Sequence, residues 1–299
     1  MQKLFPEVTL NEPLFKYSTF QIGGPSDYFY RLKDSRKLKP LLQFCKKNKL
    51  PYFILGGGSN TLFDDKGFRG LVIKVETKNI KFSKTQVTVD AGMSVATLLN
   101  ETIKNGYQGL EQWIGLPGTV GGAVRGNAGC NGLETKDVLL KATILDLKTL
   151  KIQKVTTKYF SFKYRFSKLK KSPQIVLDST FRISPRKITI EEQKSIIKEL
   201  NKNRIAKQPF GLSCGSFFKN PIPFVKEKSA GYLIEQAGLK GKTIGKAQIS
   251  PKHGNFFLNL GGATSEDIKN LASEVQKTVK SQFKIQLEPE VYFLPVKAK

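Results

Sequence analysis

The chain has 299 residues, with 50 Lys and Arg against 24 Asp and Glu, and a formal net charge of +26. This length predicts two or three domains, and a 39% hydrophobic fraction excludes a disordered chain. No apolar run approaches the roughly 20 residues of a membrane span, and the first residues lack the apolar core of a secretory signal. Three widely spaced cysteines without a Cys-x-x-Cys motif argue against disulfides and structural zinc. We therefore expect a cytoplasmic protein without a metal site.

Short alternating segments predict an α/β unit over residues 20–185, followed by a more helical region. The run Pro185-Arg186-Lys187 interrupts the pattern and predicts a domain boundary near 186–190. The predicted strands are 28–32, 52–55, 71–75, 86–90, 138–147, 152–156, 174–183 and 285–294, those between 138 and 183 being antiparallel. The predicted helices are 35–48, 94–105, 189–207, 229–237 and 264–283.

Lysine carries most of the positive charge, because only eight of the 50 basic residues are Arg. Surfaces that bind nucleic acid typically cluster Arg beside aromatic side chains that stack on bases. The lysines here are scattered along helical and turn segments. We interpret them as a solvated surface that favours anionic ligands, and expect no specific nucleic-acid partner.

Two glycine-rich segments stand out, LGGGSNT at 55–61 and GLPGTVGGA at 115–123. Glycine permits positive φ and close backbone approach, so successive N–H groups can converge on an anion. Either segment alone could be a tight turn, whereas the two together favour a phosphate cradle. The first lacks the Rossmann pattern, which would need Gly at Thr61, and a P-loop near Gly241 would need Gly at Gln236.

Eight sequence blocks, spread over about residues 18 to 294, occur in a fixed order. They are LGGGSN (55–60), DKGFRG (65–70), GLPGTVGGA (115–123) with NAG (127–129), YRFS (164–167), GSFFKNP (215–221), AGYLIEQAG (230–238), HGNF (253–256) and LEPE (287–290). In this order they resemble the UDP-N-acetylenolpyruvoylglucosamine reductase (MurB) family, and the short length is similar to its type II subgroup. The chain departs from the usual pattern at Asn131, where the family more often has an aromatic residue.

The resemblance implies an α+β fold in two parts. An FAD-binding region of the vanillyl-alcohol-oxidase (PCMH) type, itself two α/β subdomains, would cover residues 1–187. A smaller α/β substrate-binding domain would cover 188–299, with its last strand returning to the FAD region. The protein is expected to be a monomer that binds no membrane.

The implied reaction is the NADPH-dependent reduction of UDP-N-acetylglucosamine enolpyruvate to UDP-N-acetylmuramate, with FAD as hydride carrier. Reducing an alkene beside a carboxylate builds negative charge, so the protein must stabilise that charge and supply one proton. Ser216 matches the family's proton donor. Arg165 and Glu290 match the other catalytic positions, where a guanidinium pairs with the substrate carboxylate and a carboxyl group shares a proton. Glu288 competes with Glu290, but the family motif places the role on the second Glu.

The remaining site residues also follow from the resemblance. His253 is the only histidine, so neither a multi-histidine metal site nor a covalent histidyl–flavin bond in the FAD region is expected. Cys130 and Cys214 lie inside two motif loops and are interpreted as small packing residues. The cofactor-binding candidates are Gly56, Gly57, Gly58, Ser59, Asn60, Thr61, Gly118, Thr119, Gly121, Gly122, Ala123 and Asn127. The substrate-binding candidates are Tyr164, Arg204, Lys207, Asn220, His253 and Asn255.

Two alternatives stay open at this point. One is another flavin-dependent oxidase or dehydrogenase of the same fold, acting on a different small molecule. The other is a polyanion-binding protein that exploits the +26 charge, although no stacking motif supports it. A flavin that is released by denaturation and reduced by NADPH would separate the three.

Overall fold

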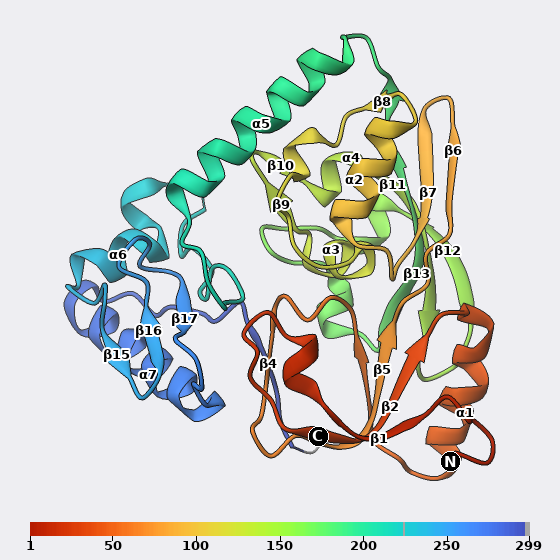
Figure 1. The fold of residues 1–299 in the computed structure, drawn as a ribbon, viewed down its shortest axis with the longest axis horizontal. Helices are drawn as coiled ribbons and strands as arrows, with labels where there is room; N and C mark the ends of the chain where they lie inside the picture. The colour runs from red at the N-terminus through yellow and green to blue at the C-terminus, as the bar shows by residue number, and fades with distance from the viewer. Residues whose placement is uncertain (224, 297–299) are drawn as a thin grey trace.

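The computed structural model describes residues 1–223 and 225–296, in which a larger body and a smaller lobe are joined by the long helix α5 (Ile190–Lys207) (Figure 1). The first sheet of the body has the strand order β1-β2-β5-β3, with β2, β5 and β3 parallel and β1 antiparallel. Helix α1 buries Leu41 and Leu42 against β5, and Pro40 lies in its first turn, where a missing N–H is tolerated. The bounds are β1 (Thr9–Pro13), β2 (Pro25–Leu32), α1 (Leu38–Lys47), β3 (Tyr52–Leu55) and β5 (Phe68–Val75).

The second sheet of the body is antiparallel throughout, with the strand order β12-β11-β13-β7-β6. The antiparallel arrangement expected for residues 138–183 is therefore confirmed. Helices α2 and α3 share a buried core with this sheet, which includes Trp113 and Phe181 packed edge to face. The elements are β6 (Ile80–Ser83), β7 (Gln86–Asp90), α2 (Val95–Lys104), β8 (Tyr107–Gln108), α3 (Val120–Gly126), β9 (Gly129–Cys130), β10 (Leu133–Glu134), α4 (Thr135–Val138), β11 (Leu139–Asp146), β12 (Ile152–Thr156), β13 (Gln174–Arg182) and β14 (Ser184–Pro185).

The smaller lobe packs two helices against a three-stranded antiparallel sheet, β15-β16-β17. The helix predicted for residues 264–283 is confirmed as α7, and its four apolar residues at helical spacing are all buried: Ile268, Leu271, Val275 and Val279. The elements are α6 (Ala230–Gln236), β15 (Thr243–Ile244), β16 (Ala247–Ile249), β17 (Phe257–Asn259) and α7 (Ser265–Phe283).

The closing segment differs from the strand predicted over 285–294. Only β18 (Tyr292–Leu294) is a strand, and it pairs in parallel with β4 (Thr61–Phe63) of the N-terminal region. The residues before it include Pro289, which has no N–H to donate to a ladder. They instead bond to the 217–219 segment, where the Glu290 N–H donates to the Phe217 carbonyl over 2.8 Å and the Lys219 N–H to the Glu288 carbonyl over 2.9 Å.

Several short elements were not predicted from the sequence. Strands β1, β4, β6 and β15 to β17 were missed, as was α3, which lies inside the second glycine segment. Glycine disfavours helix, but tertiary contacts hold this one. Thr119 caps the helix, accepting from the Gly122 N–H, and the Gly121 N–H donates to the Ala91 carbonyl over 2.9 Å.

Helix α5 is anchored to the body by Gln193, which is fully buried. Its amide nitrogen donates to a Glu111 carboxylate oxygen over 2.7 Å and to the Tyr107 carbonyl over 2.9 Å. A capping box of Thr189 and Glu192 fixes where the helix begins. Over the described residues, no helix combines the length and apolar character needed to cross a bilayer.

The core of the smaller lobe should depend on Phe257, which is fully buried and stacked on Phe217 with ring centroids 4.2 Å apart. Replacing it by Ala leaves a cavity, so we expect Phe257→Ala to lower the free energy of unfolding by about 3–5 kcal/mol in urea titrations. Phe210 is fully exposed, so Phe210→Ala should change the free energy of unfolding by no more than about 0.5 kcal/mol. Equal losses in the two variants would contradict this packing.

Candidate active site

The three predicted catalytic residues come from distant segments that meet between the body and the smaller lobe. The Arg165 guanidinium Nε lies 3.4 Å from a Glu290 carboxylate oxygen. Ser216 is exposed and pairs with Phe256 across a β-bridge. The next residue along the chain, Phe217, accepts the backbone hydrogen bond from Glu290. The structure thus places a hydroxyl, a guanidinium and a carboxyl group in one region.

Glu290 and Glu288 have different surroundings, although only Pro289 separates them. The Glu290 side chain is 19% exposed, whereas that of Glu288 is 70% exposed and forms an ion pair with Lys219. Burial raises the pKa of the Glu290 carboxyl above its usual range, and the positive charges of Arg165, Lys170 and Lys219 act against that shift. Glu290 is therefore the carboxyl group suited to hold or release a proton here.

Arg165 lies in a tight turn with a left-handed backbone, at φ 52°. The turn is closed by two hydrogen bonds of 3.0 Å between the backbones of Lys163 and Phe166. The Lys170 ammonium donates to the Arg165 carbonyl over 2.8 Å. A left-handed conformation is unfavourable for a residue with a Cβ, so the backbone at Arg165 is strained.

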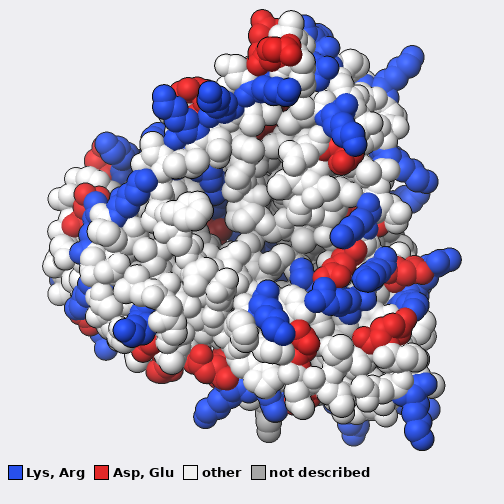
Figure 2. Space-filling view, viewed as in Figure 1, with Lys and Arg blue, Asp and Glu red and all other residues white. Residues whose placement is uncertain are grey.

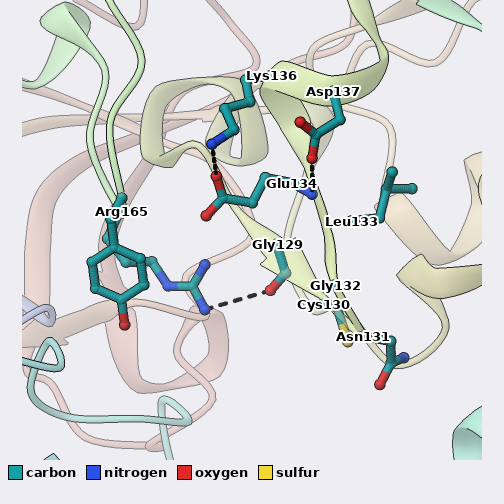
Figure 3. A pocket seen from close by; sticks show the side chains of 10 residues that line it. Gly129, Cys130, Asn131, Gly132, Leu133, Glu134, Lys136, Asp137 and Arg165 are labelled. Atoms are coloured by element: carbon teal, nitrogen blue, oxygen red, sulfur yellow. Dashed lines mark hydrogen bonds and ion pairs between the residues drawn. The ribbon is translucent and has the colours of Figure 1, made fainter. Parts of the chain in front are cut away.

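The Arg165 turn borders a cavity of about 400 Å³ between β9, β10 and α4 (Figure 3). In the close-up the guanidinium points toward the Gly129 carbonyl, 3.5 Å away. Asn131 lies on the rim, exposed, and adopts φ 49°. Asn tolerates this left-handed conformation better than an aromatic residue does.

The two glycine segments lie against each other. A Cβ on Gly57 would come 2.6 Å from the Gly118 Cα, and one on Gly118 would come 2.7 Å from the Ser59 hydroxyl. Gly58 adopts φ 68°, and a Cβ there would come 1.7 Å from the Tyr17 carbonyl oxygen. Among the described residues, no protein acceptor receives a hydrogen bond from the N–H groups of Gly57, Gly58 or Ser59. Unpaired donors in a glycine-lined cradle fit an anionic group such as the FAD diphosphate.

The side chains of Asn127 and Asn255 bond to protein. The Asn127 amide, fully buried, bonds to Glu134 and to the backbones of Lys163 and Lys136. The Asn255 amide bonds through both of its atoms to the Phe218 backbone, over 2.8 Å each. Asn127 therefore joins the end of α3 to the turn that carries Arg165, and Asn255 positions the segment that carries Ser216, while a ligand contact of either residue stays a prediction.

The other substrate-binding candidates are spread around the same region. The Tyr164 hydroxyl accepts from the Asn220 N–H over 3.5 Å, which brings these two together, and burial raises the pKa of the Tyr164 phenol. His253 accepts at Nδ1 from the Asn255 N–H over 3.1 Å, and burial lowers its pKa. Lys207 is exposed and is the last residue of α5.

The three cysteines are free and buried. Burial raises the pKa of the Cys45 thiol to about 11 and that of Cys214 to about 12, which suits packing residues. Cys130 has a neighbour that the sequence did not predict, since the Arg204 guanidinium donates to its sulfur over 2.8 Å. In this structure Arg204 therefore joins α5 to the cavity wall.

Two cations near Glu290 were missed by sequence reasoning. Lys219 was part of a recognised motif but was given no role, and Lys170 belongs to a lysine run interpreted as surface. No periodicity signals that the Lys170 ammonium turns inward while Lys171 beside it is exposed. Figure 2 shows Lys and Arg side chains spread over the visible face, with Asp and Glu among them. Over the described residues, no group of His, Cys, Asp and Glu has the geometry to hold a metal ion.

Family models match both parts of the chain. The model described as "UDP-N-acetylenolpyruvoylglucosamine reductase, C-terminal domain" matches residues 207–294. The model described as "FAD binding domain" matches residues 26–155. The second match confirms FAD as the cofactor and supports the assignment of the glycine segments to it.

Similar proteins cover almost the whole chain. The UDP-N-acetylenolpyruvoylglucosamine reductase of Chlamydia abortus is 40% identical over 284 residues, which are 94% of this chain and 93% of the relative. That of Bacillus pumilus is 38% identical over 292 residues, 95% of this chain and 93% of the relative. The crystal structure of the enzyme from Thermus caldophilus superimposes with a TM-score of 0.78 at 32% identity, covering 97% of this chain and 98% of that one. Together with the FAD-domain match, this structure confirms the expected fold class.

Alanine substitutions at Gly57 and Gly122 should distinguish a glycine needed for packing of the two loops from a glycine needed for contact with the cofactor. In Gly57→Ala the new methyl group meets the Gly118 backbone, so the loops must separate and both flavin content and apoprotein stability should fall. In Gly122→Ala the nearest atom is the Thr119 hydroxyl at 3.5 Å, so the protein alone accommodates it. We expect an apoprotein stability within about 0.5 kcal/mol of wild type but reduced flavin content, measured as flavin absorbance per chain. Full flavin occupancy in Gly122→Ala would exclude close approach at this residue.

Proposed function

This chain belongs to the UDP-N-acetylenolpyruvoylglucosamine reductase family and is an FAD-containing oxidoreductase, and on that premise we propose its substrate, hydride donor and catalytic residues. The proposed reaction is the NADPH-dependent reduction of UDP-N-acetylglucosamine enolpyruvate to UDP-N-acetylmuramate. The observation that supports it most is the convergence of Arg165, Glu290 and the segment carrying Ser216. This arrangement offers one proton donor and a positively charged site for a carboxylate.

The proposed setting is the synthesis of peptidoglycan precursors in the cytoplasm, which serves cell-wall biogenesis, cell shape and cell division. Three free cysteines support a reducing compartment. We propose a monomer, because each catalytic candidate comes from the same chain. We also propose that an FAD-binding region ends near residue 187 and that the rest binds substrate, with β18 returning to the first region.

Bound FAD supplies the transfer of a hydride from NADPH to C3 of the enolpyruvyl group. The cations of Arg165 and Lys170 then face the negative charge that spreads into the substrate carboxylate. Ser216 delivers a proton to C2, a role in which position matters more than acidity, because the carbon accepting the proton is strongly basic. Glu290, whose raised pKa favours the protonated form, shares its proton with the charged carboxylate.

The flavin should be held without a covalent bond. Glycines of the two segments and Ser59, Asn60, Thr61 and Thr119 are the proposed contacts, with close backbone approach as the physical reason for the glycines. Tyr164, Asn220, Arg204, Lys207 and His253 are the proposed contacts to the substrate's diphosphate and sugar. These charges suit a small, anionic nucleotide sugar.

Ser216→Ala should separate the two half-reactions. The variant lacks only the hydroxyl, so flavin reduction by NADPH should stay near the wild-type rate. Flavin reoxidation by the enolpyruvyl substrate should slow by about 10²–10⁴-fold, the usual contribution of a general acid. Stopped-flow absorbance of the flavin measures both steps. Equal slowing of the two would mean that Ser216 is structural.

The pair Glu290 and Glu288 offers a matched comparison. Glu290→Gln keeps the shape but cannot exchange a proton, so single-turnover reoxidation should slow strongly, whereas Glu288→Gln should stay close to wild type. Burial raises the pKa of Glu290, which favours its protonated form. The wild-type reoxidation rate should therefore fall as the pH rises through the pKa of Glu290 and the carboxyl group loses its proton. Glu290→Gln should lose this pH dependence. A slow Glu288→Gln beside a normal Glu290→Gln would place the role two residues earlier.

The same single-turnover measurement tests the guanidinium. Arg165→Lys keeps the positive charge but loses the planar fork, so it should recover only part of the rate lost in Arg165→Ala. If Arg165 and Glu290 both act on the developing negative charge, substitution of either should lower kcat more than it weakens substrate binding. A change confined to KM would assign Arg165 to substrate binding alone.

A further inference from the structure

Lys74 lies at the carboxyl end of β5, directly beneath the first glycine segment. It pairs in register with Leu55, the last residue of β3, and Gly56 follows at once. Its side chain is half-buried, and its ammonium donates a hydrogen bond to the Gly56 carbonyl. In parallel sheets, ligands bind outside the carboxyl ends of the strands, which is where this lysine points.

No carboxylate pairs with the Lys74 ammonium over the described residues. Glu76, whose negative charge acts on this ammonium, already forms an ion pair of 2.9 Å with Arg31. Burial lowers the pKa of Lys74, which reflects the cost of keeping this cation out of water. A half-buried positive charge without a counter-charge is stabilised when an anion binds nearby.

The Lys74 hydrogen bond also fixes the direction of a peptide group. The carbonyl and N–H of a trans peptide point in opposite directions. With the Gly56 carbonyl directed to Lys74, the Gly57 N–H points to the other side of the loop. That N–H and those of Gly58 and Ser59 donate to no protein acceptor in the described part of the chain. One lysine therefore orients the Gly57 donor and supplies positive charge behind the loop.

We propose that Lys74 is a positioning residue for the FAD diphosphate. It holds the first glycine loop with its N–H groups turned toward the phosphates, and its charge balances theirs from beneath the loop. This inference rests on the proposed assignment of the glycine segments to the diphosphate. It adds a residue outside the eight sequence blocks that identify the family.

The test compares Lys74→Met with Lys81→Met, which changes an exposed lysine on β6. Apoprotein of each variant is titrated with FAD and, separately, with ADP, which carries a diphosphate but no flavin. We expect Lys74→Met to weaken both ligands by about 10- to 100-fold, the range for a hydrogen bond to a charged group, and Lys81→Met to leave both unchanged. The melting temperature of the Lys74→Met apoprotein should stay at or above the wild-type value, because the change removes a desolvated charge but keeps the stem.

Wild-type affinity for FAD and ADP in Lys74→Met would overturn the proposal, as would weakening of FAD alone. Should the variant not fold, amine labelling of the wild-type protein gives a second readout. FAD should reduce the acetylation rate of Lys74 at least tenfold while that of Lys81 stays constant, and equal labelling of Lys74 with and without FAD would overturn the proposal. Failure of the proposed function would give a different result. The wild-type protein would then bind FAD but not oxidise NADPH, and the effect of Lys74→Met on FAD and ADP binding would be unchanged.

Discussion

Asn60 joins the first glycine loop to the closing segment that carries Glu290. Its side-chain amide donates to the Glu290 carbonyl over 2.9 Å, and its own carbonyl accepts from the Tyr292 N–H over 3.0 Å. These bonds connect residues about 230 positions apart, and the β18–β4 pairing continues them. These hydrogen bonds, one from the Asn60 side chain and the others between backbones, therefore fix the first glycine loop relative to the candidate catalytic residue Glu290.

The charges around Glu290 explain why one region can hold both an acid and an anionic substrate. Removing a carboxyl group from water favours its protonated form. Three cations, Arg165, Lys170 and Lys219, oppose this effect and leave the region with an excess of positive charge. A substrate carboxylate would neutralise part of that excess. The balance differs at Glu288, whose exposed side chain pairs with Lys219 and keeps an ordinary surface environment.

The sequence predicted the long periodic elements well, because local patterning determines them. The strands at 52–55, 86–90 and 152–156 agree with the structure to the residue. Failures occurred where tertiary contacts override propensity. Helix α3 forms from a glycine-rich segment that is capped by Thr119 and held by Ala91, and the closing strand is shortened before Tyr292 by Pro289.

The site was predicted from motifs, which specify residues but not partners. Motif matching found Ser216, Arg165 and Glu290, and the structure brings their segments together. It could not show that the Asn255 amide is bonded fully to the Phe218 backbone, or that Lys170 donates to the Arg165 carbonyl. Such contacts depend on side-chain direction, which carries no signal in a single sequence.

The pairing of β18 with β4 has a consequence for biosynthesis. A chain leaves the ribosome from its N-terminus, and domains generally fold in that order. Strand β4 ends at Phe63, yet its partner begins at Tyr292, so the two pairing strands are synthesised far apart in time. The N-terminal sheet can form early on the nascent chain, but the contact that brings Glu290 to the first glycine loop must wait until Tyr292 has been synthesised. The first sheet can therefore form before the candidate catalytic residues meet.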